Sequence, residues 1–141
     1  MRGLLDDCLS ELAQWGEVDF AYPYFDAYWD ARERRWPYLL QRSGAVCGFA
    51  LVNAASPSGR GTDFAMAELY IAPPARRCGI GRDAAVRVFL MHAGLWELGI
   101  FARNKPAQRF WPKAIAATGT DNVERIDADG ETIYRFRTGE R

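Results

Sequence analysis

Three segments of the chain repeat apolar residues at the spacing of one helix face. Residues 4–15 show this pattern and should form an amphipathic helix that ends near Gly16. A second helix begins at Ile80, and a third follows Asn104, whose side chain suits the position before a helix. Pro112 should kink or end this third helix, because its ring displaces a backbone hydrogen bond. The predicted apolar stripes are Leu4, Leu5, Cys8, Leu9, Leu12 and Ala13; Ala84, Ala85, Val88, Phe89 and Met91; and Ala107, Phe110, Trp111, Ala114 and Ile115.

Short apolar runs bounded by turn residues predict the strands. Ser43-Gly44 and Asp129-Gly130 each separate two such runs and indicate hairpins. Pro73-Pro74 forbids the strand before it from continuing in a central sheet position. Residues 53–63 form a flexible loop, either a mobile flap or a plain connection. The predicted strands are residues 38–40, 46–52, 64–72, 96–103, 123–127 and 132–136.

A segment rich in aromatic residues lies between the first helix and the first strand. The rings of residues 18–36 either pack onto the sheet or line a substrate pocket, since apolar pockets with a few polar tips are the usual ligand sites. The rings that we assign to such a pocket are Tyr22, Tyr24, Trp29 and Trp36.

Length and charge exclude several classes of function. The chain has 141 residues, of which 49% are apolar and 26% charged, and this fits one ordinary globular domain over residues 1–141. Its 18 Lys and Arg residues equal its 18 Asp and Glu residues, so no overall charge favours nucleic acid or an acidic membrane. Any anion site must therefore be local.

The cysteine pattern argues against a metal site. Cys8, Cys47 and Cys78 are scattered, and with the single His92 they do not make a zinc-binding pattern. Reduced thiols are typical of the cytosol. The start of the chain lacks the basic and apolar pattern of a signal peptide, and the most apolar stretch, residues 86–102, contains three ionisable side chains. We expect a cytoplasmic protein that crosses no membrane and holds no metal.

A phosphate-binding turn is predicted between the third predicted strand and the second helix. A short apolar strand enters a loop marked by prolines, the loop becomes Arg76-x-x-Gly79-x-Gly81, and a helix begins at once. The glycines let the backbone come close to a ligand, and the unpaired N–H groups of the first helical turn point at an anion. Together with a second strand that stops at Asn104, this pattern favours a pyrophosphate site.

These motifs resemble the GNAT superfamily of N-acetyltransferases. The family's central motif is an Arg or Gln, two residues, Gly, one residue, then Gly or Ala, and residues 76–81 are similar to it. Residues 69–73 resemble the strand before this motif, and Asn104 to Trp111 resemble a later family element, in a match that is specific over residues 64–116. The resemblance implies an α/β (α+β) fold, with a mixed, mostly antiparallel sheet and helices on both faces. The sheet would splay at its centre, between the strands that end near Ile71 and Arg103.

The resemblance also implies an acetyl-coenzyme A site. Amides of residues 77–82 would hold the pyrophosphate, and the pantetheine arm would lie in the notch between the splayed strands. The Ile71 backbone would hydrogen-bond this arm, a nearby strand N–H would polarise the thioester carbonyl, and Asn104 would contact the arm, cap its helix, or do both. The cofactor-binding residues so implied are Leu69, Tyr70, Ile71, Arg76, Arg77, Cys78, Gly79, Ile80, Gly81, Arg82, Asn104, Ala107, Phe110 and Trp111.

Glu68 is the residue to which the resemblance assigns the chemistry. It lies three residues before Ile71, on the strand that would flank the thioester. An ammonium group must lose its proton before it attacks, and a carboxylate can take that proton directly or through water. Burial would raise the pKa of this carboxyl group toward neutral pH. The alternatives are a carboxylate that only binds a cationic substrate and one that is merely solvated.

One position departs from the family pattern. Many members have a Tyr, thought to protonate the departing thiolate, where this chain has Trp111. An indole N–H donates a hydrogen bond but does not release its proton at a usable pH. Three interpretations stay open: Trp111 steadies the thiolate, Tyr70 or Tyr134 replaces the acid, or Trp111 only packs its helix onto the sheet.

The resemblance predicts transfer of an acetyl group from acetyl-coenzyme A to the primary amine of a small molecule. Direct attack is expected, because the scattered Cys and His residues offer no pair of nucleophile and base. Two alternatives are a non-catalytic module that binds acyl-coenzyme A, and an acetyltransferase acting on a lysine or N-terminal amine of a protein. A closed aromatic pocket would favour the small acceptor, and a long open groove the protein. An exposed terminal hairpin would also allow a homodimer.

Overall fold

The fold combines helices with one mixed sheet. The computed structural model describes residues 1–30, 32–76 and 78–139. The α-helices of this part of the chain are α1 (Arg2–Leu12), α2 (Ile80–Met91) and α3 (Lys105–Ala116), and the short 3-10 helices are η1 (Asp26–Trp29) and η2 (Pro73–Ala75). The strands are β1 (Trp36–Arg42), β2 (Ala45–Asn53), β3 (Phe64–Ile71), β4 (Gly94–Phe101), β5 (Glu124–Ala128) and β6 (Glu131–Thr138).

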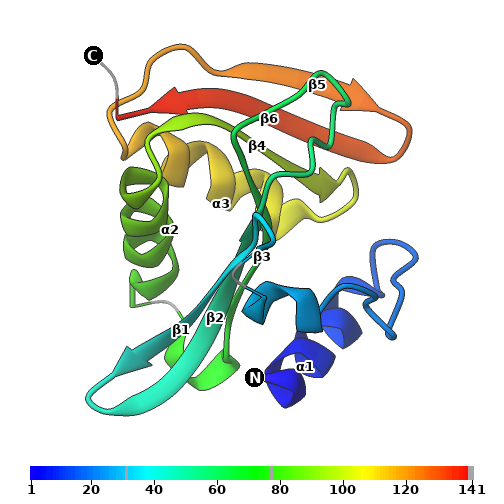
Figure 1. Ribbon diagram of the computed structural model, residues 1–141, viewed down its shortest axis with the longest axis vertical. Helices are drawn as coiled ribbons and strands as arrows, with labels where there is room; N and C mark the ends of the chain where they lie inside the picture. Colours follow the sequence, from blue (N-terminus) through cyan, green and yellow to red (C-terminus); the bar gives the residue numbers. More distant parts are fainter. Residues whose placement is uncertain (31, 77, 140–141) are drawn as a thin grey trace.

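The sheet is divided near its centre. Its strand order is β1-β2-β3-β4-β6-β5, and all neighbours are antiparallel except β3 and β4, which are parallel. The β3–β4 ladder contains only the Cα pairs Phe64↔Trp96 and Ala65↔Glu97. Beyond these pairs the strands diverge, so β1–β3 and β4–β6–β5 form two halves (Figure 1). The predicted fold class, with its splayed sheet, is confirmed.

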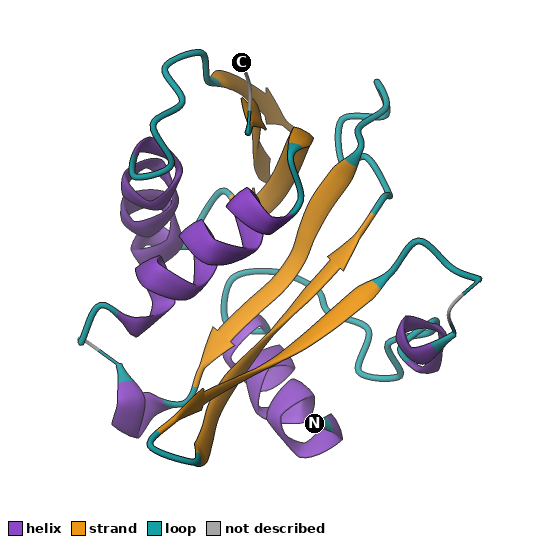
Figure 2. Cartoon of the chain, turned by 60° about the vertical axis from the view of Figure 1, so that its left-hand side comes forward, coloured by secondary structure: helices purple, strands orange, loops and turns teal. Residues whose placement is uncertain are grey.

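Strand β2 explains why helices cover both faces of the sheet. Its residues 47–52 are all buried, unlike those of a strand with one face in water. Phe49 and Leu51 point toward one face, and Ala50 and Val52 toward the other, as the alternation of a strand requires. Helices α2 and α3 bury the Ala50 face, while α1 and η1 bury the Phe49 face. Figure 2 shows α1 and the α2–α3 pair on opposite sides of β1–β3.

Most predicted elements are present, with ends shifted by a few residues. Helix α1 ends at Leu12 rather than near Gly16. Gly16 instead lies against the ring of Phe101, where an added Cβ would be 2.5 Å from Cε1. Helix α3 continues through Pro112 to its end at Ala116, so the proline does not end it. Pro112 removes one backbone donor, whereas tertiary packing of the buried apolar face stabilises the whole helix.

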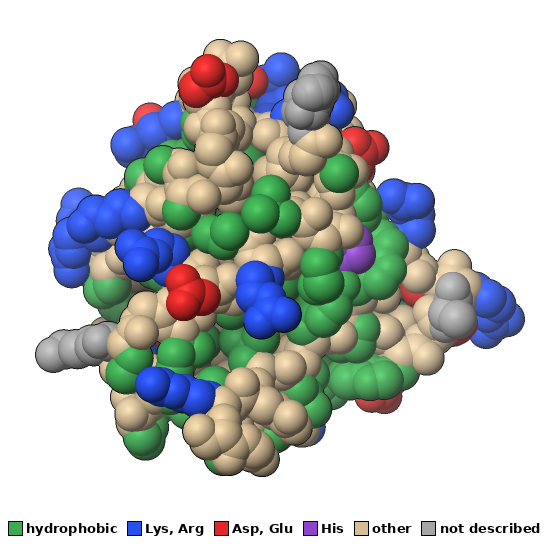
Figure 3. Space-filling view, turned by 90° about the vertical axis from the view of Figure 1, so that its left-hand side faces the viewer, with side chains coloured by type: hydrophobic (Ala, Val, Ile, Leu, Met, Phe, Trp, Pro, Cys, Tyr) green, Lys and Arg blue, Asp and Glu red, His purple; other side chains and the backbone are tan. Residues whose placement is uncertain are grey.

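The surface carries no single dominant charge on the face shown in Figure 3, which is the left-hand side of Figure 1. Lys and Arg side chains lie there in separate places, among apolar and acidic ones. This agrees with the balanced composition, and any strong field must come from a local arrangement.

Candidate functional site

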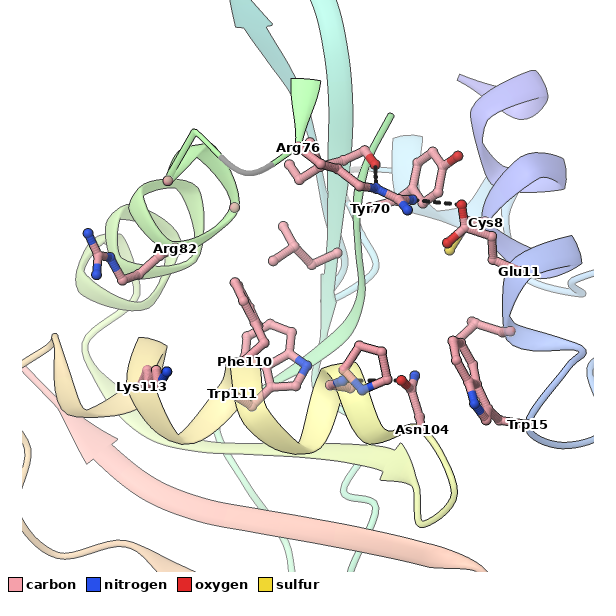
Figure 4. A pocket seen from close by; sticks show the side chains of 17 residues that line it. Cys8, Glu11, Trp15, Tyr70, Arg76, Arg82, Asn104, Phe110, Trp111 and Lys113 are labelled. Carbon is pink, nitrogen blue, oxygen red and sulfur yellow. Dashed lines mark hydrogen bonds and ion pairs between the residues drawn. The ribbon is translucent and has the colours of Figure 1, made fainter. Parts of the chain in front are cut away.

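A cavity of about 620 Å³, here called the large cavity, lies between the end of β3, the start of α2, helix α3 and the N-terminal region. Figure 4 shows Arg82 and Lys113 at one end of it, and Glu11 and Trp15 from the N-terminal region at the other. Of the predicted cofactor residues, those that line it are Leu69, Tyr70, Ile71, Arg76, Gly79, Gly81, Arg82, Asn104, Ala107, Phe110 and Trp111. Cys78 and Ile80 are not among its lining residues, and Arg77 lies outside the residues that the structure describes.

The first turn of α2 forms one end of the large cavity. Gly79 precedes the helix with a φ of 78°, a left-handed conformation that favours glycine. No described side chain caps this helix, so the first-turn N–H groups of Ile80, Gly81 and Arg82 have no helical partner. Such amides attract anions, and the charges of Arg82 and Lys113 add to the attraction. This end of the cavity therefore suits a phosphate group.

Arg76 lines the large cavity, but its guanidinium group is already engaged. Its Nε donates a hydrogen bond of 2.7 Å to the Ile71 carbonyl oxygen, and its Nη2 lies 2.7 Å from Oε2 of Glu11. The group also lies over the ring of Tyr70, 5.4 Å from the ring centroid. Arg76 therefore ties α1 to the loop after β3, and its charge is largely neutralised by Glu11.

Helix α3 supplies the apolar wall that faces β3. Asn104 caps this helix, because its Oδ1 accepts a hydrogen bond of 3.1 Å from the Ala107 backbone N–H. The capping role is therefore confirmed, and Asn104 also lines the large cavity. Phe110 and Trp111 stand edge to face beside it, with ring centroids 4.8 Å apart. Tyr134, one candidate for a general acid, is buried in the core and is not a lining residue.

A second cavity of about 330 Å³, here called the small cavity, lies where β3 and β4 diverge, and residues of both strands line it. The two cavities meet between β3 and α3, where they share the lining residues Leu12, Leu69, Asn104, Ala107 and Trp111. Two carboxylates, Glu68 and Glu131, line the small cavity, and no Lys or Arg is among its described lining residues.

A β-bulge in β3 determines where Glu68 points. Leu51 pairs with Glu68 and Val52 with Met66, which leaves Ala67 as an extra residue without a partner. Met66 packs into the core under α2 and α3, so strict alternation would send Glu68 to that same face. The extra residue reverses this direction, and the Glu68 carboxylate lies instead beside side chains on the α1 face.

Two donors contact the Glu68 carboxylate. The Tyr22 hydroxyl donates to Oε2 at 3.1 Å, and the Cys8 thiol lies 3.8 Å from Oε1. Burial raises the pKa of Glu68 to about 7, although both donors act to lower it. Burial, followed by the negative charge of Glu68, raises the pKa of both Cys8 and Tyr22. Glu68 is thus the titrating group of the three near neutral pH.

The four aromatic residues predicted for a substrate pocket have different positions. Only Tyr22 reaches Glu68, and its φ of 44° is a left-handed value that is uncommon outside glycine. The side chains of Tyr24 and Trp29 are exposed. Trp36 packs on the α2 face of the sheet, where its ring lies 5.3 Å from that of Phe64. The structure therefore does not bring these four rings together in one pocket.

The loop after β2 is anchored at its middle by a buried carboxylate. Glu97 on β4 accepts hydrogen bonds of 2.9 and 2.7 Å from the Ser56 and Ser58 hydroxyls, and it pairs with Arg135. Burial alone would raise the pKa of Glu97, but these donors hold it below its usual value. Of the two interpretations of residues 53–63, the anchored connection fits this network.

Sequence reasoning missed the contribution of the N-terminal region to the site. Cys8, Glu11, Leu12 and Trp15 line the large cavity, and nothing in the local pattern of this helix distinguishes them from ordinary positions of an amphipathic face. Glu131, on β6, was missed as well, because nothing in its local sequence distinguishes it from an ordinary strand position. Within residues 1–30, 32–76 and 78–139, no set of side chains is placed to ligate a metal ion. No helix in that part of the chain combines the length and apolarity needed to cross a bilayer.

Comparisons with known proteins identify a family and a fold. The model of the acetyltransferase (GNAT) family matches residues 4–115. The fold is similar to that of an acetyltransferase from Thermus thermophilus, with a TM-score of 0.66 and 18% identity, over 96% of this chain and 88% of that chain. It is also similar to the putative acetyltransferase yncA from Salmonella typhimurium, solved with its cofactor acetyl-CoA (TM-score 0.65, 16% identity, 99% of this chain and 87% of that chain).

A third similar structure is diaminobutyrate acetyltransferase EctA from Paenibacillus lautus, in complex with L-2,4-diaminobutyric acid and coenzyme A. Its TM-score is 0.62, with 11% identity over 96% of this chain and 88% of that chain. No curated protein sequence matches the chain. At these identities the structural matches establish the shared fold.

Proposed function

The chain belongs to the GNAT acetyltransferase family, and from this premise we propose that it transfers an acetyl group from acetyl-coenzyme A to the primary amine of a small molecule. The observation that carries the proposal is the junction of two cavities of opposite character at Leu69 and Trp111, with Glu68 next to Leu69 in the wall of the small cavity. One cavity suits a phosphorylated donor, and the other presents a carboxylate whose pKa lies near neutral pH.

The large cavity fits acetyl-coenzyme A. The free amides of Ile80, Gly81 and Arg82 would hold its pyrophosphate, with the side chains of Arg82 and Lys113 beside them. The apolar wall from α3 and β3 would hold the pantetheine arm. When bound, this donor supplies a thioester, whose acyl carbon is open to attack by an amine.

Glu68 would act as the base for the acceptor amine. Its carboxylate is partly ionised at neutral pH, and a base is most effective when its pKa lies near the working pH. Tyr22 orients the carboxylate by donating a hydrogen bond to it. The other carboxylate oxygen lies beside the Cys8 thiol, and no Lys or Arg among the described residues forms an ion pair with Glu68.

Direct attack is preferred to a covalent route, although the structure does pair a thiol with a base. Cys8 lies 3.8 Å from Glu68, a contact that the sequence did not suggest. Burial and the charge of Glu68 raise the pKa of this thiol, so the nucleophilic thiolate is disfavoured. The acceptor amine meets no comparable obstacle once Glu68 takes its proton.

The leaving group needs little help from an acid. A thiol has a pKa of about 8.5, so a thiolate is a tolerable leaving group near neutral pH. Trp111 lines both cavities and donates only a hydrogen bond, which suits a role in steadying the sulfur. Tyr70 lines the large cavity and remains the candidate acid on that side.

The size of the small cavity supports a small acceptor. At about 330 Å³ it lies at the lower end of the usual range for small-molecule pockets, roughly 300–1,000 Å³. A neighbour of the same fold, EctA, was solved with a small diamino acid, which agrees with an acceptor of this size.

The proposal is tested by calorimetric titration with acetyl-coenzyme A. Gly79→Glu should abolish binding, because it adds a negative charge where the pyrophosphate would lie. Gly59→Glu is the matched control: Gly59 has the same φ of 78°, and an added Cβ meets no atom within 4 Å at either glycine. The control should bind like the wild type. Absence of binding by the wild type, or equal binding by Gly79→Glu, would overturn the donor assignment.

A further inference from the structure

The two cavities at the notch differ in charge. The large cavity is lined by Arg82 and Lys113 in addition to the Arg76–Glu11 pair. The described lining of the small cavity contains Glu68 and Glu131 and no basic side chain. An acidic cavity with low-dielectric walls concentrates cations. The proposed proton transfer accounts for the carboxylate of Glu68, whereas the carboxylate of Glu131 has no role in that step.

Glu131 is directed across the sheet by a neighbouring glycine. It is the first residue of β6 and pairs with Phe101 of β4 and Ala128 of β5. Its side chain lies over Gly99 of β4, where an added Cβ would be 2.9 Å from the carboxyl carbon of Glu131. Any larger residue at position 99 would therefore displace the carboxylate. The glycine gives Glu131 the space to reach the small cavity.

The Glu131 carboxylate has no partner among the described residues. In the part of the chain that the structure describes, Glu11 pairs with Arg76 and Glu97 with Arg135, and Glu68 accepts a hydrogen bond from Tyr22. Burial raises the pKa of Glu131, and no described donor or cation opposes this effect. The Glu131 oxygens keep contact with solvent, so the carboxylate is open to a cation that enters the small cavity. The wall of an acceptor cavity is where such a partner would arrive.

We propose that the acceptor carries a second cationic group, which Glu131 binds while the reacting amine lies at Glu68. The acceptor class is therefore a linear diamine or polyamine rather than a simple monoamine. This inference rests on the proposed function, because it takes the small cavity as the acceptor site. Glu131 is then a specificity-determining residue, whose contact is made before and during acetyl transfer alike.

Binding measurements test the proposal directly. Putrescine and cadaverine are titrated into the protein saturated with coenzyme A, and each is compared with butylamine or pentylamine, the monoamine of the same length. The wild type should prefer the diamines. Glu131→Gln should weaken diamine binding on the order of tenfold to a hundredfold, the usual effect of losing a hydrogen bond to a charged group, and leave monoamine binding unchanged.

Two further variants separate this contact from general effects on charge. Gly99→Ala keeps the carboxylate but displaces it, and should weaken diamine binding in the same direction. Asp127→Asn removes one negative charge from an exposed position on the same hairpin, and should bind diamines like the wild type. Equal affinity for diamines and monoamines, a preference that survives Glu131→Gln, or failure of both diamines to bind would overturn the proposal.

Steady-state kinetics distinguish this inference from the proposed function. Glu131→Gln should raise KM for the diamine with little change in kcat, because the contact is the same in the ground state and the transition state. Acetylation of putrescine and butylamine that depends on Glu68, with the same KM for putrescine in the wild type and in Glu131→Gln, would preserve the proposed function and refute the second cation. Diamine binding that depends on Glu131, without turnover of any amine, would refute the proposed function and leave the diamine site standing.

Discussion

Replacing Glu68 with Gln should change how the stability of the fold depends on pH. Burial raises the pKa of Glu68 from 4.5 to about 7. Between these values the folded chain binds more protons than the unfolded chain, so this group makes folding less favourable as the pH rises. At about 1.36 kcal/mol for each pH unit between these two pKa values, the loss amounts to about 3 kcal/mol. Gln does not titrate, so the variant should lack this loss.

The assay is urea unfolding of both proteins at one pH below about 4.5 and one above about 7. The stability of Glu68→Gln relative to the wild type should increase by about 3 kcal/mol between them, and the comparison cancels the titration of all other groups. Glu17→Gln, at an exposed position outside both cavities, should stay within about 0.5 kcal/mol of the wild type at each pH. An identical stability difference at the two pH values would refute the assignment of a raised pKa to Glu68.

The Glu68→Gln variant also tests the role of Glu68 in catalysis, where a rise in pH should increase turnover although it lowers stability. Wild-type turnover should rise with pH through about 7, because only the ionised carboxylate takes a proton from the acceptor. Glu68→Gln should bind acetyl-coenzyme A normally and lose turnover at every pH. Equal turnover of both proteins at saturating acceptor would remove Glu68 from the mechanism.

Two further substitutions test the contacts around the site. Tyr22→Phe removes the hydroxyl that donates to Glu68, so the pKa of Glu68 should increase. The midpoint of the pH–rate profile should then move upward by roughly one pH unit. An unchanged midpoint would show that this hydrogen bond does not affect the pKa of the base. Gly48→Ala should lower the thermal unfolding midpoint and reduce the free energy of unfolding by about 1–3 kcal/mol, because its Cβ would collide with the backbone carbonyl oxygen of Tyr70. The control is Gly3→Ala, whose Cβ would meet nothing within 4 Å and which should not lower the midpoint.

Local patterns predicted the elements well because each depends on residues close in sequence. Asn104 caps α3 through the backbone of Ala107, three residues away, and Gly79 supplies the left-handed turn at the start of α2. Both features are visible as residue types at fixed spacing. Pro112 shows the limit of such reasoning, because packing of the buried face of α3 outweighs one lost backbone hydrogen bond.

The arrangement around Glu68 was not predictable in the same way. In the sequence Tyr22 is one aromatic residue among several, and only the fold separates it from Trp36, which lies on the opposite face of the sheet. Cys8 reaches Glu68 across 60 residues of sequence. Such contacts depend on how α1 docks onto β3, and no short-range pattern reports the docking geometry.

The sequence by itself determined the type and order of the elements, the uncapped glycine turn before α2, and the family to which these features belong. These properties follow from backbone conformation and apolar periodicity, which act over a few residues. Only the tertiary structure decided which way Glu68 points, which donors contact it, and that Glu131 shares its cavity. A single extra residue in β3 reverses the direction of the Glu68 side chain, and Gly99 on β4 makes room for the side chain of Glu131. The chemistry of the site depends on these long-range alignments, because charge and burial are set by everything that packs nearby.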